Sequence, residues 1–310
     1  MHDHLMRGLG PEGRYRYVAT VYTDAAREAA RRHGLTGASA VALARALGAG
    51  LCLATLTNGG ERVTLQWHTD GPLGVVVADA HDDGNVRGYV RGPAGLMLPE
   101  GGAGGAGGRP SVAAAVGSGG TLTVIRDLGL RDAYIGQGEV VDGEIDRDVE
   151  RYLTVSEQID SALRCEVVPD PDGGARLVRA AAVLIQAMPV KDSEGVGEHV
   201  AAVRATLGAG ALWDLLSGDN GARLDAGMLA ASVVPEGAVG VLSEVPVQFH
   251  CGCDGERVRT ALSTLGPADL DKLAEERGGA EVTCQFCAET HRLDPDGVRA
   301  LARELRSTLN

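Results

Sequence analysis

The stretch that decides the fold of the C-terminal part of this 310-residue chain is FHCGCDGERVRTALSTLGPADLDKLAEERGGAEVTCQFCAE, residues 249–289. It holds four of the six cysteines, two in a CGC motif (Cys251 and Cys253, the CGC pair) and two in a CQFC motif (Cys284 and Cys287, the CQFC pair). Close cysteines supply thiolate ligands two at a time, and zinc prefers four such ligands in a tetrahedron. The spacing therefore predicts one zinc ion bound by both pairs.

The residues around the cysteines narrow the kind of metal site. His250 and His291 flank the pairs and are candidate replacement ligands, although a single histidine in such a place is more often a surface residue. The segment between the pairs, residues 254–283, has seven acidic and four basic residues, which disfavours DNA binding. Four protein ligands leave no position for a catalytic water, which disfavours a hydrolytic zinc. A purely structural zinc stays open at this point.

The composition excludes several classes of protein. The formal net charge is −13, so the chain repels nucleic-acid phosphates and we expect no nucleic-acid partner. The first residues, MHDHLMRGLGPEGRYRYV, contain no apolar signal segment, and we expect no apolar run long enough to cross a bilayer and no membrane partner. These features predict a cytoplasmic protein, in which clustered cysteines more often bind metal or serve redox chemistry than form structural disulfides.

The part of the chain before the cysteines reads as strands interrupted by helices. A strand is expected at 14–22, followed by a helix with Asp24 as its N-cap and Gly34 as its stop. Residues 37–56 are apolar on most faces and predict a buried helix. Tight turns then separate short strands of a predicted antiparallel meander, namely RVTLQWHT at 62–69, LGVVVADA at 73–80 and VRGYVRG at 86–92.

The following segments complete the predicted domain organisation. The run GGAGGAGG at 101–108 lacks the lysine and hydroxyl residue of a phosphate-binding loop and predicts a surface loop. Further expected elements are strands at 120–127 and 132–140, one or two helices over 144–164, and a strand pair around the turn at 170–174. The fold class is therefore α+β, with an N-terminal antiparallel-sheet domain with helices over 1–190. A helical linker over 191–240 and a small C-terminal zinc-binding domain over 241–310 are expected to follow.

The remaining candidate residues indicate no catalytic centre. Cys52 lies in the predicted buried helix and Cys165 lies beside a strand, so both are interpreted as core residues. Neighbouring carboxylates such as Glu275 and Glu276 are typical of a solvated helix face. The sequence contains no convincing Ser-His-Asp or Cys-His set, so we predict no catalytic residues and no enzymatic activity.

The cysteine pattern resembles that of the redox-regulated molecular chaperones of the heat-shock protein 33 family. In that family Cys-x-Cys is followed, after about thirty residues, by Cys-x-x-Cys near the C-terminus, and here the two motifs stand as CGCDGERV and EVTCQFCAE. The segments WHTDGPLG, VRGYV, VGSGGTLTVIRD and VLIQAMP also look like family segments in the expected order. The resemblance covers most of the chain and implies the same three-part organisation.

The resemblance implies a holdase chaperone that works without ATP, is inactive when reduced and zinc-bound, and is active when oxidised. Peroxide or hypochlorous acid attacks thiolates and would join them in disulfides. We predict that Cys284–Cys287 closes before Cys251–Cys253, because the larger ring is less strained. Zinc would then leave, the C-terminal domain and linker would unfold, and apolar surface would bind unfolding client proteins. The resemblance also implies a homodimer on activation.

Two other functions remain open at this point. A thiol–disulfide oxidoreductase could use the CQFC pair, although that chemistry usually places Cys-x-x-Cys after a strand and at a helix N-terminus. A scaffold module with a purely structural zinc would lose its function on oxidation instead of gaining one.

Overall fold

The chain forms two compact units in the computed structural model, residues 1–250 and residues 251–310. The structure describes residues 2–56, 59–99, 108–170, 177–189, 196–234 and 240–309. Both units combine helices with strands, so the predicted α+β class is confirmed. Most of the predicted loop at 101–108 and of the turn at 170–174 lies outside the described residues.

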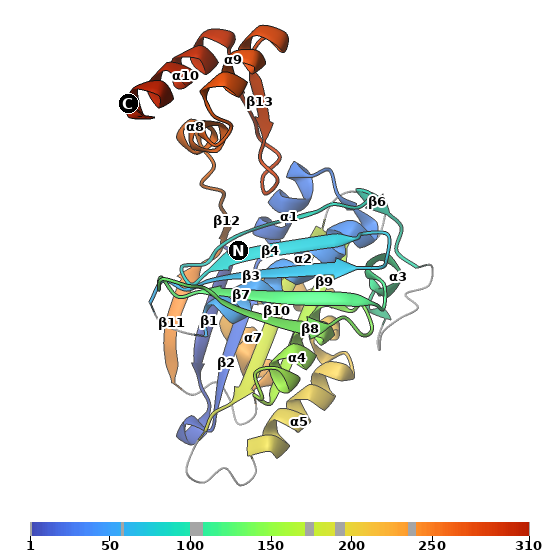
Figure 1. The fold of residues 1–310 in the computed structure, drawn as a ribbon. Coiled ribbons are helices and arrows are strands. Elements are labelled where there is room, and N and C mark those ends of the chain that lie inside the picture. Colours follow the sequence, from blue (N-terminus) through green and yellow to red (C-terminus); the bar gives the residue numbers. More distant parts are fainter. Residues whose placement is uncertain are drawn as a thin grey trace. The chain divides into compact units, whose positions relative to one another are not determined.

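The first unit is built on two sheets (Figure 1). A five-stranded antiparallel sheet has the order β11-β1-β2-β10-β9, with β1 His4–Leu9, β2 Tyr15–Val21, β9 Ser161–Pro169, β10 Leu177–Ala187 and β11 Val241–Pro246. A six-stranded sheet has the order β12-β5-β4-β3-β7-β8, with β3 Arg62–Thr69, β4 Val75–His81, β5 Asn85–Val90, β7 Gly120–Asp127, β8 Tyr134–Glu139 and β12 Gln248–Phe249. The predicted meander β3-β4-β5 is confirmed as antiparallel, whereas β12 joins β5 in parallel.

Helices fill and cover these sheets. Those described in the first unit are α1 Thr23–Arg32, α2 Gly37–Ala54, α3 Ala113–Val116, α4 Ile145–Val155, α5 Val196–Gly208, α6 Ala211–Ser217 and α7 Ala226–Val233. Three short elements complete the unit: η1 Pro11–Gly13 between β1 and β2, β6 Gly95–Leu96 after β5, and η4 Asp219–Arg223 between α6 and α7. Helix α2 contacts strands of both sheets, so it forms the layer between them and carries the larger core.

The sequence of α2 explains its central place. Seventeen of its residues are buried, and they are mostly alanine and leucine, which let strands approach the helix from both sides. A Cβ atom at Gly48 would lie 2.3 Å from the hydroxyl oxygen of Tyr22, so this contact requires glycine. By length and composition α2 could cross a membrane, so the expectation that no apolar run is long enough is wrong. The apolar composition of α2 is that of a core helix, since 94% of its residues are buried.

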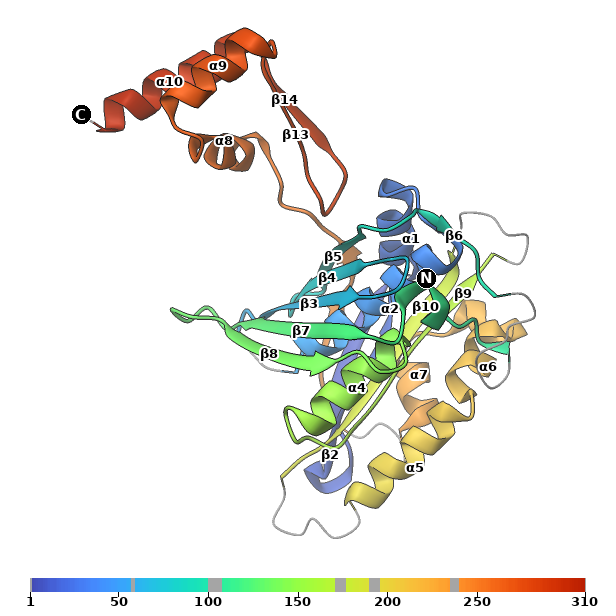
Figure 2. The same cartoon turned by 45° about the vertical axis from the view of Figure 1, so that its right-hand side comes forward.

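Helices α5, α6 and α7 cover the other face of the five-stranded sheet (Figure 2). A second core lies beneath them. Side chains along β2 point alternately to the two faces of the sheet. Val18 therefore faces the core around α2, while Tyr17 and Ala19 face the second core under the three helices. Both faces of the sheet are therefore buried. The helical pattern predicted within 191–240 is confirmed over the described residues 196–234.

Several local expectations were wrong, each for a physical reason. Asp24 is not the N-cap of α1, since its side chain pairs with Arg27 inside the first turn. The cap comes from far along the chain, because the Asp3 carboxylate accepts a hydrogen bond from the Ala25 amide at 2.8 Å. The helix expected over 144–164 ends at Val155, because the following residues enter β9 and pair with β10.

The end of the first unit differs from the boundary expected at residue 240. Strand β11 pairs antiparallel with β1, and β12 follows it into the six-stranded sheet. These backbone hydrogen bonds hold residues 241–250 in the first unit, so the second unit begins at Cys251.

A buried network of charges links the core helix to the sheet. The Arg45 guanidinium of α2 is fully buried and donates to the Glu144 carboxylate at 2.7 Å. Arg109 bridges Glu144, Asp146 and Glu166, with Asp146 at 2.7 Å. Removing one member of such a network would leave a buried charge without its partner, which is strongly destabilising. The network therefore favours the arrangement in which α2, α4 and β9 lie together.

The second unit is small and contains α8 Gly255–Ser263, α9 Pro267–Glu276, β13 Ala280–Thr283, β14 Thr290–Leu293 and α10 Pro295–Leu309. The Asp254 carboxylate caps α8 by accepting from the Arg257 amide at 2.8 Å. Its core consists of few buried residues, namely Val258, Leu262, Leu270, Ala274, Ala280, Val298, Leu301 and Ala302. A unit with so little buried apolar surface has little stability of its own.

Candidate functional site

The CGC pair and the CQFC pair come together in the second unit. All four sulfur atoms lie within 4.8 Å of one another. The Cys251 and Cys284 sulfurs are 3.7 Å apart, and the Cys253 and Cys287 sulfurs are 3.1 Å apart. Both distances exceed the ~2.05 Å of a disulfide bond, so this is the arrangement of reduced thiols.

The donor set fits a tetrahedral zinc site. Zinc–sulfur bonds of about 2.3 Å place neighbouring sulfurs of a tetrahedron about 3.8 Å apart. The 3.7 Å separation of Cys251 and Cys284 matches this edge, and the 3.1 Å separation of Cys253 and Cys287 requires only a small expansion. The four-cysteine cluster could therefore hold a metal ion and is compatible with zinc.

The backbone positions the CQFC pair in the turn between β13 and β14. The Cys284 amide donates to the Glu289 carbonyl at 2.9 Å, and the Ala288 amide donates to the Cys284 carbonyl at 2.9 Å. Ala288 adopts a left-handed conformation with a φ of 57°, which closes the turn. A hairpin turn is not the helix N-terminus that activates a thiol in oxidoreductases, so the local structure does not favour that alternative.

Charge and burial act on the thiols of this cluster. Burial raises the pKa of Cys253, and its hydrogen bond with the Cys287 sulfur raises it further. Burial also raises the pKa of Cys287, whose side chain is 2% exposed. A coordinated divalent cation opposes these effects, since it holds a bound thiol deprotonated.

The two flanking histidines differ in their surroundings. His250 is exposed at the end of the first unit, where its amide donates to the Val86 carbonyl. His291 is half-buried, and one ring nitrogen lies within 4.8 Å of both the Cys253 sulfur and a carboxylate oxygen of Glu289. His291 therefore lies beside the cluster, and its role as a replacement ligand stays a prediction. Sequence reasoning did not single out Glu289, although an acid two residues after the CQFC motif and a histidine two residues further are visible signals.

The other two cysteines lie elsewhere, in the core of the first unit. Cys52 on α2 and Cys165 on β9 are both fully buried, which confirms their interpretation as core residues. Burial raises the pKa of each thiol far above its ordinary value, so neither forms a thiolate readily. Glu275 and Glu276 are exposed on α9, as expected.

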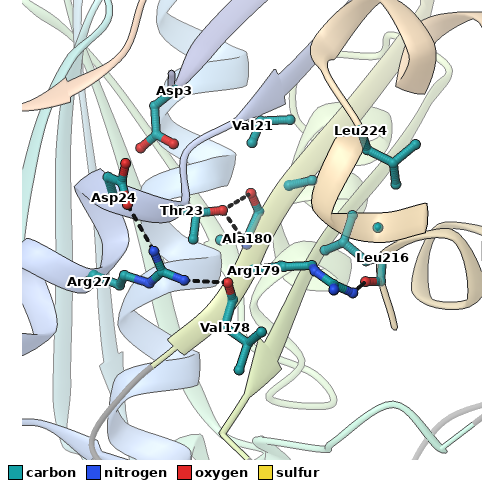
Figure 3. Close-up of a pocket in the computed structure, with 12 residues that line it drawn as sticks. Asp3, Val21, Thr23, Asp24, Arg27, Val178, Arg179, Ala180, Leu216 and Leu224 are labelled. Carbon is teal, nitrogen blue, oxygen red and sulfur yellow. Dashed lines mark hydrogen bonds and ion pairs between the residues drawn. The ribbon is translucent and has the colours of Figure 1, made fainter. Parts of the chain in front are cut away.

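Within the first unit, a cavity of about 430 Å³ lies where the linker helix α6 and the following η4 meet β10 and α1 (Figure 3). On one side, Arg179 of β10 donates to the carbonyls of Leu216 and Gly218, the latter at 3.1 Å. These carbonyls belong to the C-terminal end of α6, so Arg179 satisfies helix-end groups that have no partner within the helix. On the other side, Arg27 of α1 donates to the Val178 carbonyl at 2.6 Å (Figure 3).

The linker helices cover an extensive apolar face of the sheet. The residues beneath and within them that form this second core include Tyr15, Tyr17, Ala19, Val21, Ala181, Val183, Ile185, Val200, Val203, Leu207, Leu212, Leu216, Leu224, Leu229 and Val233. Sequence reasoning did not identify Arg179 as a docking residue, although an arginine in the apolar run LVRAAAVLIQA was a visible signal.

Comparisons with known proteins agree with this architecture. The family model described as "Hsp33 protein" matches residues 3–294. The chain belongs to the Hsp33 family. A 33 kDa chaperonin of Gloeobacter violaceus is 36% identical over 309 residues, covering 99% of this chain and 97% of its own. That of Bacillus subtilis is 33% identical over 304 residues, covering 96% and 98%.

A solved structure supports the same assignment. The crystal structure of the 33 kDa chaperonin (heat shock protein 33 homolog) from Thermotoga maritima matches with a TM-score of 0.83 and 27% identity. The match covers 99% of this chain and 100% of that one. The Hsp33 resemblance noted in the sequence is therefore confirmed, and this is a chain of a chaperone family.

Proposed function

We propose that this Hsp33-family chain is a redox-regulated holdase, which binds unfolding proteins without ATP and prevents their aggregation. One observation carries the proposal: four cysteine sulfurs lie within 4.8 Å of one another in a unit whose apolar core is small. In the proposed cycle the reduced, zinc-bound chain is inactive, and oxidation activates it.

A bound zinc ion would hold the CGC and CQFC pairs as thiolates and would supply on the order of 10–16 kcal/mol of folding free energy to the second unit. Hydrogen peroxide would take two electrons from the Cys284 and Cys287 thiolates as they form a disulfide, would be reduced to water with two protons from solvent, and would so remove two of the ligands. A second peroxide would do the same at Cys251 and Cys253, and no thiolate would then remain to hold zinc. Without the metal, the small core is too weak to keep residues 251–310 folded.

Unfolding of the second unit is proposed to loosen the linker. Residues 240–250 join the linker helices to Cys251, and they are held to the first unit through β11 and β12. Release of α5, α6 and α7 would expose the apolar face of β2 and β10, including Tyr17 and Val183. A large exposed apolar face is a surface on which unfolding proteins bind.

The proposed partners follow from this cycle. They are unfolded or aggregation-prone proteins and, in the activated state, a second copy of this chain. We propose a cytoplasmic, non-enzymatic protein that has no catalytic residues and binds neither nucleic acid nor membranes. The three-part division into an N-terminal domain, a linker and a zinc-binding redox switch is proposed as a functional one.

One experiment tests the cycle directly. The reduced zinc-loaded protein is treated with hydrogen peroxide at elevated temperature while zinc release, disulfide pairing by peptide mapping and aggregation of a heat-unfolded client are followed. We expect Cys284–Cys287 and Cys251–Cys253 disulfides, loss of zinc and suppression of aggregation. Retention of zinc under strong oxidation would refute the switch, and zinc release without suppression of aggregation would refute the holdase. Disulfides between the two motifs would refute the proposed pairing.

A further inference from the structure

The start of β1 contacts three separate parts of the first unit. The Val247 amide, just before β12, donates to the Asp3 carbonyl at 3.0 Å, and the Asp3 carboxylate caps α1 through the Ala25 amide. The side chain of the next residue, His4, lies at the beginning of the linker helix α7. There its Nε2 atom accepts a hydrogen bond from the Ala226 amide at 3.1 Å. One histidine therefore joins α7 to the sheet that α7 covers.

The second ring nitrogen of His4 shows where the proton of the neutral ring must lie. The Nδ1 atom is 3.0 Å from the His2 carbonyl oxygen. A carbonyl oxygen only accepts hydrogen bonds, so Nδ1 must carry the proton. The Nε2 atom of the neutral ring is then the acceptor that the Ala226 amide needs. Both contacts therefore exist together in one form of the side chain, the neutral ring that is protonated at Nδ1.

A second proton on the His4 ring reverses the contact with α7. The Nε2 atom of an imidazolium is a donor, so it would meet the donor of the Ala226 amide, and its positive charge would lie at the positive end of the helix dipole. Ala226 is the first residue of α7, where an amide has no partner within the helix. Because histidine is the side chain whose charge ordinarily changes between pH 5 and pH 8, mild acid is enough to break this contact.

The other titratable groups around His4 do not account for a loosening of α7 in acid. They are His2 and Asp3 on its own segment, Asp225 at the N-cap of α7 and Glu244 on β11, whereas β2 places an apolar residue opposite His4. Burial raises the pKa of Asp3 from 3.8 to about 6. Because this pKa lies above the ordinary value, proton uptake by Asp3 favours the folded first unit as the pH falls through 6. Asp225 and Glu244 are carboxylates with which an imidazolium that has left the amide can pair.

We propose that His4 is a pH-sensitive latch on the linker: its neutral ring holds the start of α7 on the first unit, and its protonated ring releases it. Helix α7 contacts β1 and β2 and contributes Leu229 to the second core, so its release exposes apolar surface while the cysteines stay reduced. Mild acid would thus open part of the surface that oxidation is proposed to open. That this surface then binds unfolding proteins rests on the proposed function.

Hydrogen–deuterium exchange of the reduced, zinc-loaded full chain at pH 7.5 and pH 5.5 tests the latch. After correction for the intrinsic pH dependence of exchange, α7 amides should lose protection by roughly tenfold at pH 5.5, because one hydrogen bond is lost and its donor is left unpaired. His4→Gln keeps an acceptor that does not titrate, so it should abolish this response, whereas the matched control His2→Gln should retain it. A response caused by metal loss would appear equally in His4→Gln. An equal response in His4→Gln, or no response in the unmodified protein, overturns the proposal.

Nitrogen-15 NMR of the imidazole rings tests the protonation state directly in the unmodified protein. At pH 7.5 the His4 ring should be protonated at Nδ1 and unprotonated at Nε2, and the amide signal of Ala226 should shift as the ring takes up its second proton. A neutral ring protonated at Nε2, or an Ala226 signal that does not follow the ring, overturns the latch.

Client aggregation separates this inference from the proposed function. If α7 loses protection in acid through His4 but neither the acidified nor the oxidised protein suppresses aggregation, the holdase proposal fails and the latch stands. If the oxidised protein suppresses aggregation and α7 shows no response that depends on His4, only the latch inference fails.

Discussion

Truncation of one buried linker side chain should open the linker while the metal cluster stays reduced. Leu229 of α7 is fully buried in the second core, on a helix that contacts β1 and β2. Leu229→Ala removes apolar atoms from a packed site, which typically costs about 2–5 kcal/mol. A cost of about 3 kcal/mol corresponds to a roughly 150-fold larger population of the opened linker, if α5, α6 and α7 open together.

Hydrogen–deuterium exchange of the reduced, zinc-loaded protein measures this opening. Peptides within 196–234 should exchange faster by up to about 150-fold in Leu229→Ala, and the reduced variant should suppress client aggregation in part. The matched control is Met228→Ala on the same helix, because Met228 is 45% exposed and its truncation creates no cavity. Equal exchange in the two variants would show that the second core does not hold the linker down.

Three further predictions address docking, pH and metal removal. Arg179→Met removes the donor to the Leu216 and Gly218 carbonyls. Hydrogen–deuterium exchange of α6 amides should become faster, corresponding to a loss of about 1–3 kcal/mol in the free energy of opening. An unchanged exchange rate would contradict the docking role of Arg179. Burial raises the pKa of Asp148 from 3.8 to about 7, so its stabilising contribution is present below pH 4 and is lost as the pH rises through 7. In urea titrations, the free energy of unfolding should fall between pH 5 and pH 8 by roughly 2–3 kcal/mol less in Asp148→Asn than in the unmodified protein. An equal fall in the two proteins would contradict this. Chelation of zinc from the reduced protein should make residues 251–309 sensitive to trypsin while α2 stays protected, and joint digestion of both would contradict independent stability of the first unit.

Much of the fold followed from local patterns. The alanine- and leucine-rich run of α2 predicted a buried helix, and the turns between β3, β4 and β5 predicted the meander, because both signals lie within a few residues of the elements they specify. The true cap of α1 could not be found in this way. Asp3 and the Ala25 amide are 22 residues apart, and only the pairing of β1 with β2 brings the carboxylate to the helix.

In the candidate site, too, short spacings in the sequence could be predicted, whereas contacts between distant segments could not. The members of the CGC pair are two residues apart and those of the CQFC pair three apart, so the local backbone alone keeps each pair close and its ligand role is visible in the sequence. The proximity of His291 to Cys253 depends on the β13–β14 hairpin and on the fold that places Cys253 beside it. The sequence therefore named the histidine as a candidate without deciding between a ligand and a surface residue.

The sequence by itself determined the family, the α+β class and the four cysteines, since these depend on residue types and short spacings. Only the tertiary structure decided that residues 241–250 belong to the first unit, because β11 pairs with β1 from the opposite end of the chain. It also decided that the linker helices cover an apolar face of β2 and β10. Such contacts join segments far apart in the sequence, and a local pattern shows that a strand has an apolar face without showing what covers it.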